Sequence, residues 1–128
     1  MRRLGKDENI YVKVLTKIGC DDYGNKISED FKKEDITIDD IVFDDNDSTP
    51  FTYVIVSESD ATRTCIHHPL QHPLNEDDFK DNWLLNIDLC KPVDLLFLDS
   101  RHHEGAIKAA IEARNRKIPI LLDMEKIR

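Results

Sequence analysis

Two short apolar segments separated by a helical pattern constrain the fold of this chain more than any other feature. Val93–Leu98 and Ile118–Leu122 are nearly continuous in apolar residues, which is typical of strands buried on both faces. Parallel strands need a crossover connection of a dozen or more residues, so this order predicts a βαβ unit whose two strands are parallel. The apolar stripe of the intervening helix consists of Ala106, Ile107, Ala110 and Ile111.

The N-terminal part predicts a strand followed by a helix. Ile10–Thr16 is rich in β-branched and aromatic residues and predicts a strand. In the turn that follows, Asp21 or Asp22 can cap a helix, because a short carboxylate accepts the unpaired N–H groups of a first turn. We expect this helix to end near Glu34. Its apolar stripe consists of Tyr23, Ile27 and Phe31.

The middle of the chain predicts three strands with no helix between them. They are Ile38–Phe43, Phe51–Val56 and Thr62–His67, and the short polar segment before the last one predicts a hairpin. From Asn75 onward a helical period returns and predicts another helix. The apolar face of that helix consists of Phe79, Trp83, Leu84 and Ile87.

Composition excludes several classes of protein. The chain has 128 residues, the length of one domain, and its 40% of hydrophobic residues excludes wholesale disorder. A net charge of −8 repels phosphate backbones and anionic lipid, so no nucleic-acid or membrane partner is expected. Cys20, Cys65 and Cys90 are widely spaced, which argues against a disulfide framework or a structural zinc site. We therefore expect a cytoplasmic protein.

The strongest candidates for a binding site follow the two apolar strands, because ligands of open α/β sheets bind at the carboxyl ends of strands. Asp99 and Arg101 follow the first strand, and Asp123 and Glu125 follow the second. A carboxylate accepts hydrogen bonds from vicinal hydroxyls, and a guanidinium can pair with that carboxylate or bind phosphate. This pattern suits a polyhydroxyl ligand. The alternative is a surface ion pair that caps the next helix.

Arg63 is a second candidate, on a strand whose alternation places it on one face with Cys65 and His67. Beside a cleft it could contact phosphate, and simple solvation is the equal alternative. Cys65 has no orienting third group in the sequence, so we do not expect a thiol nucleophile.

Three other patterns fall short of a site. Gly19–Gly24 resembles a phosphate-binding loop, but its lysine does not follow the second glycine, and a tight strand-to-helix turn is the better interpretation. Asp44–Pro50 starts like a calcium loop but lacks the glycine and the final glutamate. No metal site is expected from the histidines either, because they lack ligand spacing; they are His67, His68, His72, His102 and His103.

Lys17–Gly24 contains the string Gly-x-Asp-x-x-Gly. Five further segments belong with it, namely Arg3–Gly5, Phe51–Val56, Thr62–His67, Leu96–Glu104 and Ile118–Arg128. In this order the segments together resemble the PfkB, or ribokinase-like, carbohydrate kinases, in which the first string is (V/I)G-x-D-x-x-G. They are closest to the ketohexokinase-like and plant-type members.

The resemblance implies an α/β, partial ribokinase-like fold, with a mostly parallel sheet, flanking helices and a small β-strand lid over about residues 38–67. Residues 1–128 would form a partial kinase domain that lacks its N- and C-terminal parts. The implied activity is ATP-dependent phosphorylation of a small sugar, with Mg-ATP as the cofactor of the full-length enzyme. Asp99 matches the family's sugar-contacting acidic position, Arg63 matches a lid arginine that reaches toward sugar and phosphate, and Gly19 matches a backbone position.

The departures from the family pattern are equally informative. The Gly-Gly-x-x-Asn sugar-binding string and the Gly-Ala-Gly-Asp anion hole with the catalytic base are absent, and Ser100 replaces a glycine. We therefore assign no catalytic, cofactor-binding or metal-binding residue, and we expect this chain to be inactive and poorly folded on its own. The alternative is a non-catalytic binding or interaction protein that keeps the lid strands, through which a homodimer could form.

Overall fold

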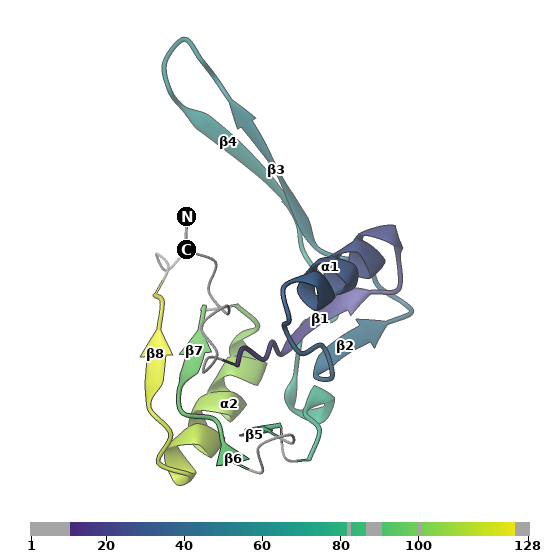
Figure 1. Ribbon diagram of the computed structural model, residues 1–128. Coiled ribbons are helices and arrows are strands. Elements are labelled where there is room, and N and C mark those ends of the chain that lie inside the picture. The colour runs from purple at the N-terminus through teal and green to yellow at the C-terminus, as the bar shows by residue number, and fades with distance from the viewer. Residues whose placement is uncertain (1–10, 82, 87–90, 100, 125–128) are drawn as a thin grey trace. The chain divides into compact units, whose positions relative to one another are not determined.

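The structure is a computed structural model that describes residues 11–81, 83–86, 91–99 and 101–124 (Figure 1). The chain divides into two compact units, residues 1–73 and 74–128, and each is described by itself. The first unit contains β1 (Thr16–Gly19), α1 (Asp22–Lys33), β2 (Ile41–Asp44), β3 (Phe51–Val56) and β4 (Arg63–His68). The second contains η1 (Glu76–Asp78), β5 (Leu85–Asn86), β6 (Lys91–Pro92), β7 (Leu96–Leu98), α2 (His103–Asn115) and β8 (Ile120–Leu122).

A parallel strand pair with one helix forms the body of the first unit. β1 pairs with β2, with Thr16 opposite Ile41 and Gly19 opposite Asp44. Helix α1 is capped by Asp21 and ends at the C-cap Glu34, which confirms the helix expected from the sequence. Its buried residues are Gly24 and Ser28, whereas the stripe residue Tyr23 is exposed. Small residues rather than the apolar stripe therefore carry its closest packing.

Both strands of this pair begin later than the sequence predicted. The predicted strand Ile10–Thr16 is replaced by β1, which starts at Thr16, and Ile10 lies outside the described residues. The predicted Ile38–Phe43 is replaced by β2, which starts at Ile41. Continuous ladder pairing begins only where Thr16 meets Ile41, and before it there is a single isolated bridge from Lys13 to Thr37. Intrinsic β propensity predicted strands here, but the available partner determines their limits.

Strands β3 and β4 form a long antiparallel hairpin that extends away from β1, β2 and α1 (Figure 1). The hairpin confirms the two predicted strands, with β4 displaced by one residue. Phe51 is opposite His68 at the base, and Val56 is opposite Arg63 at the far end. Most of its residues are exposed on both faces, so the hairpin is joined to the first unit mainly at its base.

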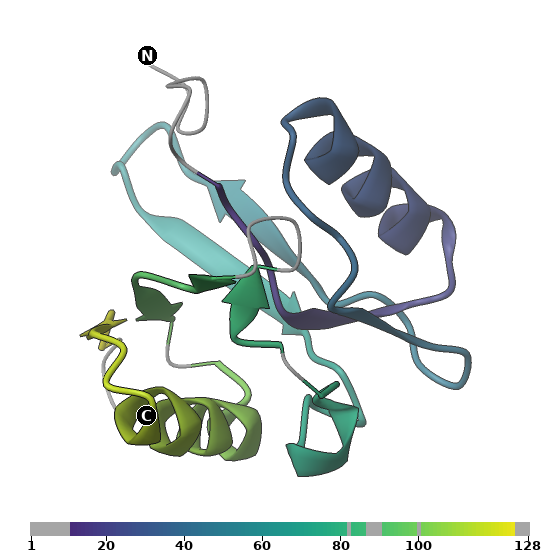
Figure 2. The ribbon, with the colours of Figure 1, turned by 60° about the horizontal axis from the view of Figure 1, so that its bottom comes forward.

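The second unit contains the predicted βαβ arrangement. β7 and β8 are parallel, with Leu96 opposite Ile120 and Leu98 opposite Leu122, and α2 lies against this pair (Figure 2). The predicted stripe of α2 is wrong, because Ile107 and Ile111 are more than half exposed. The buried residues are Gly105, Ala109 and Ala113. These small residues allow close approach; a Cβ at position 105 would lie 3.1 Å from Leu74.

The helix predicted from Asn75 onward is also wrong. Among its described residues, this segment forms only the short 3-10 helix η1, and Phe79 then adopts an extended backbone with φ −83° and ψ 123°. A capping box between Asn75 and Asp78 closes this turn. Trp83 is buried, and its indole N–H donates to Glu112 Oε2 of α2 at 2.6 Å. The Phe79 and Trp83 rings nevertheless pack edge to face with centroids 5.0 Å apart, and Ile87 lies outside the described residues.

The apolar strands of the second unit are not buried on both faces. Phe97 and Leu121, which are register partners, are 56% and 54% exposed. On the opposite face, Leu122 is 47% exposed and its register partner Leu98 is partly covered. The face that carries Phe97 and Leu121 is therefore open to solvent in the described structure, which corrects the prediction that both strands are buried on both faces. Within the described residues, neither helix has the length and hydropathy needed to cross a membrane.

We predict that the open face drives self-association of the 128-residue chain. Leu121→Lys should lower the associated fraction in sedimentation velocity, because it places a charge on an exposed apolar patch. Leu98→Lys is the matched control on the partly covered face of β7, and it should disrupt folding instead. Unchanged association of Leu121→Lys, with an unchanged circular dichroism spectrum, would contradict the prediction.

Candidate functional site

The carboxyl ends of β7 and β8 bring two predicted site carboxylates to one edge of the sheet. Asp99 directly follows β7, and Asp123 directly follows β8. The Asp123 backbone N–H donates to the Leu98 carbonyl at 2.8 Å, which extends the parallel pairing up to both aspartates. Both residues are exposed. Glu125, the other predicted carboxylate at this edge, lies outside the described residues.

Arg101 is held beside Asp99 through its backbone. Its N–H donates to Asp99 Oδ1 at 3.1 Å, an i to i+2 hydrogen bond that shapes the turn between β7 and α2. His102 then takes a left-handed backbone conformation, with φ 48°, as the N-cap of α2. Its ring accepts the Leu74 N–H at Nδ1, at 3.2 Å. The turn therefore orients one Asp99 oxygen, and the other is available to accept a ligand hydroxyl.

Arg63 lies in the first unit, at the end of β4 farthest from the base of the hairpin. Strand alternation places it with Cys65 and His67, as predicted, and His67 Nδ1 lies 2.9 Å from the Thr52 hydroxyl across the hairpin. The structure describes Arg63 in one unit and Asp99 with Arg101 in the other. A sugar site shared by the three residues therefore stays a prediction.

The turn between Gly19 and Gly24 has a packing role. A Cβ at position 19 would lie 2.4 Å from the Asp47 carbonyl oxygen, and one at position 24 would lie 2.2 Å from the Gly19 carbonyl oxygen. Real Cβ atoms do not approach backbone this closely, so both glycines are needed where the chain segments cross. This geometry supports a tight strand-to-helix turn over a phosphate-binding loop.

Asp21 joins this turn to the segment that leads into the hairpin. Its Oδ1 accepts the Thr49 hydroxyl at 2.6 Å and the Gly24 N–H at 2.8 Å, and its Oδ2 accepts the Thr49 N–H at 2.8 Å. The Thr49 hydroxyl in turn accepts the Gly19 N–H at 3.1 Å. The pKa of the Asp21 carboxyl is lowered, first by the Thr49 hydroxyl and then by the two backbone N–H groups.

Asp47 makes a similar set of bonds two residues before Thr49. Its Oδ2 accepts the N–H groups of Gln71 and His72, at 2.6 and 2.9 Å, and its Oδ1 accepts the Ser48 N–H at 2.8 Å. The pKa of this carboxyl is lowered, with the His72 N–H as the largest cause. Asp47 therefore holds the chain that leaves β4.

One group of side chains within the described residues has the composition of a metal site. Asp44, Asp47 and His72 offer ligand atoms within 4.8 Å of one another. Asp47 already accepts three backbone hydrogen bonds, and the Lys17 ammonium lies 3.5 Å from Asp44 Oδ2, where it supplies a competing positive charge. These contacts explain the group without an ion, so we assign no metal to it.

Cysteine chemistry is not favoured at the turn. Cys20 is exposed, but the pKa of its thiol is raised, mainly by a hydrogen bond to Asp45 and further by burial and nearby carboxylates. A raised pKa lowers the thiolate fraction that nucleophilic attack requires.

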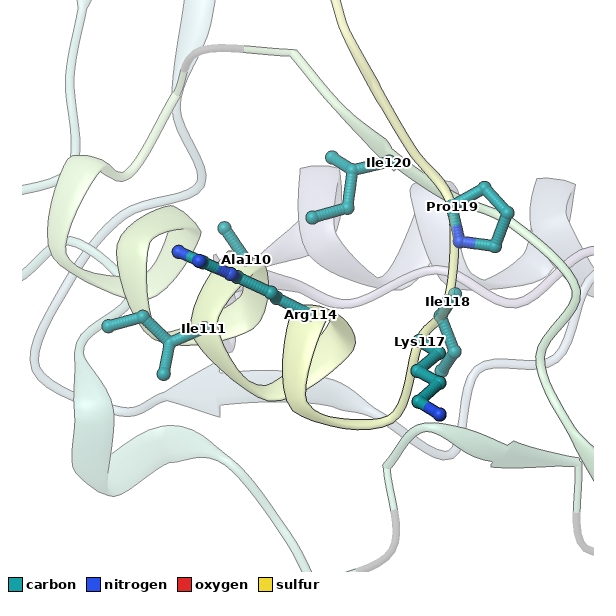
Figure 3. A pocket seen from close by; sticks show the side chains of 7 residues that line it. All are labelled: Ala110, Ile111, Arg114, Lys117, Ile118, Pro119 and Ile120. Atoms are coloured by element: carbon teal, nitrogen blue, oxygen red, sulfur yellow. The ribbon is translucent and has the colours of Figure 1, made fainter.

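A hollow of about 510 Å³ lies beside the end of α2 (Figure 3). Arg114 extends across it, and Ile118 and Pro119 form another wall. These two residues precede β8, so the hollow lies at the amino end of that strand. It is therefore separate from the carboxyl edge that carries Asp99 and Asp123.

Sequence reasoning missed two of the residues that organise the first unit. Thr49 and Asp47 lie in a polar loop that looks featureless apart from its acidic start. Their partners are 28 and 24 positions away in sequence, and no local pattern reports such pairings. For Asp21, the sequence predicted a role as helix cap but not its hydrogen bonds to Thr49.

A parallel strand pair joined by a helix, with carboxylates at its carboxyl end, is the arrangement of an α/β protein. A family model described as "pfkB family carbohydrate kinase" matches residues 1–125. The chain belongs to the pfkB family of carbohydrate kinases. No curated protein matches it.

Solved structures confirm the ribokinase-like fold. The chain is similar to a fructokinase from Xylella fastidiosa, with a TM-score of 0.77 and 12% identity over 93% of this chain and 37% of that one. It is also similar to a sugar kinase from Pyrococcus horikoshii that was solved with ATP. The TM-score is 0.73, with 16% identity over 93% of this chain and 39% of that one. For a fructokinase from Halothermothrix orenii the TM-score is 0.68, with 23% identity over 90% of this chain and 40% of that one. The chain thus spans about two fifths of these proteins.

We predict that Gly24→Ala destabilises the first unit by about 2 kcal/mol or more, because the added methyl meets backbone that cannot move aside. Urea unfolding followed by circular dichroism measures this loss. Lys26→Ala, an exposed substitution on the same helix, should stay within about 0.5 kcal/mol of the parent. Equal stability of the two variants would show that the close contact can relax.

Acidification should remove the contribution of Asp21 to stability. Its folded pKa is lowered, so the stabilisation is present above the unfolded pKa of about 3.9 and is lost as the pH falls through the folded value. The free energy of unfolding, measured in urea between pH 5 and pH 2.5, should therefore fall more steeply for the parent than for Asp21→Asn. Asp22→Asn, which leaves the Asp21 bonds intact, should keep the parent slope. An Asp21→Asn slope equal to the parent's would overturn this assignment.

Proposed function

We propose that this chain forms part of the sugar-binding side of a pfkB-type kinase, and that the closest members are ketohexokinase-like or plant-type. The observation that carries the proposal is the pair of carboxylates, Asp99 and Asp123, at the carboxyl ends of two adjacent parallel strands. The subgroup is supported by the hairpin segments and by the string Asp99–Glu104. Family membership supports a carbohydrate as the ligand.

In this proposal Asp99 accepts hydrogen bonds from sugar hydroxyls. Its Oδ1 is fixed by the Arg101 N–H, so the carboxylate presents Oδ2 in one orientation. Arg101 contributes positive charge near the sugar, and Arg63 reaches the ligand from the hairpin, which acts as the lid. The lid would exclude water when a phosphoryl group is transferred.

We propose further that the complete enzyme uses Mg-ATP and that these 128 residues do not catalyse the transfer alone. The Pyrococcus sugar kinase solved with ATP supports the nucleotide. The Gly-Ala-Gly-Asp string, which the family resemblance associates with the base and the anion hole, does not occur in this sequence. Phosphoryl transfer depends on positioning and charge stabilisation, and both would then come from outside these residues. A cytoplasmic location fits such an enzyme.

A second candidate is a non-catalytic interaction protein. The hairpin supports it, because Tyr53, Val54 and Ile55 are each more than half exposed and its outer edges can accept another strand. In this alternative the lid strands pair two copies of the chain, and sugar binding is absent.

We predict weak sugar binding that depends on Asp99. Saturation-transfer NMR with a panel of ketoses and pentoses should give a signal for the parent chain and lose it for Asp99→Asn. Asp94→Asn, an exposed carboxylate just before the same strand, should retain the signal. Isothermal titration with Mg-ATP should give no heat.

Two results would contradict the proposal. ATP binding would place a nucleotide site within these residues. Absence of any sugar signal from a stable, soluble homodimer would instead favour the interaction protein.

A further inference from the structure

The hairpin β3–β4 is anchored through contacts that gather at its base. On the entry side, the N–H and hydroxyl of Thr49 both donate to Asp21, two residues before β3 begins. On the exit side, the N–H groups of Gln71 and His72 both donate to Asp47, three and four residues after β4 ends. Both ends of the hairpin are therefore held by carboxylates.

The two carboxylates form one connected set. Asp47 and Thr49 belong to the same short loop, so the exit of the hairpin is tied to its entry through Asp47. Thr49 ties this loop to Asp21, which also caps α1 through the Gly24 N–H. The side chain of Asp47 is 1% exposed and Thr49 is 1% exposed, whereas the donors Gln71 and His72 are exposed.

Aromatic contacts support the same region. The Phe51 ring lies 5.0 Å from the His68 ring and 5.0 Å from the Tyr53 ring, and 6.0 Å from Tyr23 of α1. Beyond this group the strands are exposed, with Val54, Ile55 and Val56 all more than half accessible. Nothing in the described part of the first unit covers the outer half of the hairpin, so its direction is determined where it starts.

We propose that Asp21 and Asp47 are positioning residues that fix the direction in which the hairpin leaves the first unit. The inference rests on the proposed function in one respect, namely that the hairpin carries Arg63 toward a sugar. Loss of either carboxylate would leave the strand pairing intact but allow the hairpin to take a range of directions. Asp47 is the more selective position, because it contacts the hairpin exit and does not cap α1.

The orientation can be measured in the full 128-residue chain without any ligand. Spin labels on Glu29→Cys of α1 and Glu58→Cys of the hairpin loop, with the native cysteines replaced by serine, give a distance distribution by double electron–electron resonance. We expect a narrow distribution for the labelled parent and one about twofold broader for Asp47→Ala. Asp47→Asn should give a distribution narrower than that of Asp47→Ala, because the amide oxygen can accept both the Gln71 and His72 N–H groups and only the Ser48 bond is lost.

Two further variants keep the test decisive. Asp45→Ala removes an exposed carboxylate from the same loop and should leave the distribution narrow. Thr49→Val removes the hydroxyl donor to Asp21 and should broaden the distance distribution. This variant tests the proposal if the circular dichroism spectrum shows that Asp47→Ala does not fold. A narrow distribution in both Asp47→Ala and Thr49→Val, or equal broadening in Asp45→Ala, would overturn the proposal. Because no sugar is present, these outcomes are independent of whether the chain binds one.

Discussion

The carboxylate of Asp21 connects two parts of the chain that are 28 residues apart. It caps α1, and it binds both the backbone and the hydroxyl of Thr49. Three donors on one partly buried carboxylate favour its ionised form and fix the loop from Asp47 to Thr49 against Gly19 and Gly24. The parallel pair β1–β2, the start of α1 and the base of the hairpin all meet at this loop. The geometry of the first unit therefore depends on this one side chain and on two glycines that leave room for it.

Sequence patterns predicted the elements whose cause is local. The helix α1 was predictable because the Asp21 cap and the spacing of its apolar residues lie within one short segment. The hairpin and the parallel pairing of β7 with β8 were predictable from alternation, from a short polar connection and from crossover length. Asp99 was predictable as a site candidate because it directly follows an apolar strand, and the structure places it beside Asp123 at one sheet edge.

The errors arose where a distant partner decides the outcome. The helix expected after Asn75 is replaced by the short η1, and Trp83 from that segment donates to Glu112 of α2, 29 residues away in sequence. The buried side of α2 is its small-residue face, since Gly105 must approach Leu74 closely, and hydrophobicity alone could not identify that face. The contacts of Thr49 and Asp47 follow the same rule. Their partners are far away in sequence, and no pattern within a few residues encodes them.

The hairpin has a mechanical consequence that follows from its length. Five residue steps from Phe51 to Val56, at about 3.4 Å each, place Arg63 about 17 Å from the base. An angular error of about 10° at the base would displace the far end by about 3 Å, which is the whole length of a hydrogen bond. A small change of angle at the base of the hairpin therefore becomes a large displacement at its far end. The position of the far end therefore depends on how stiff a few hydrogen bonds at the base are, and substitutions at the base can change what the far end can reach.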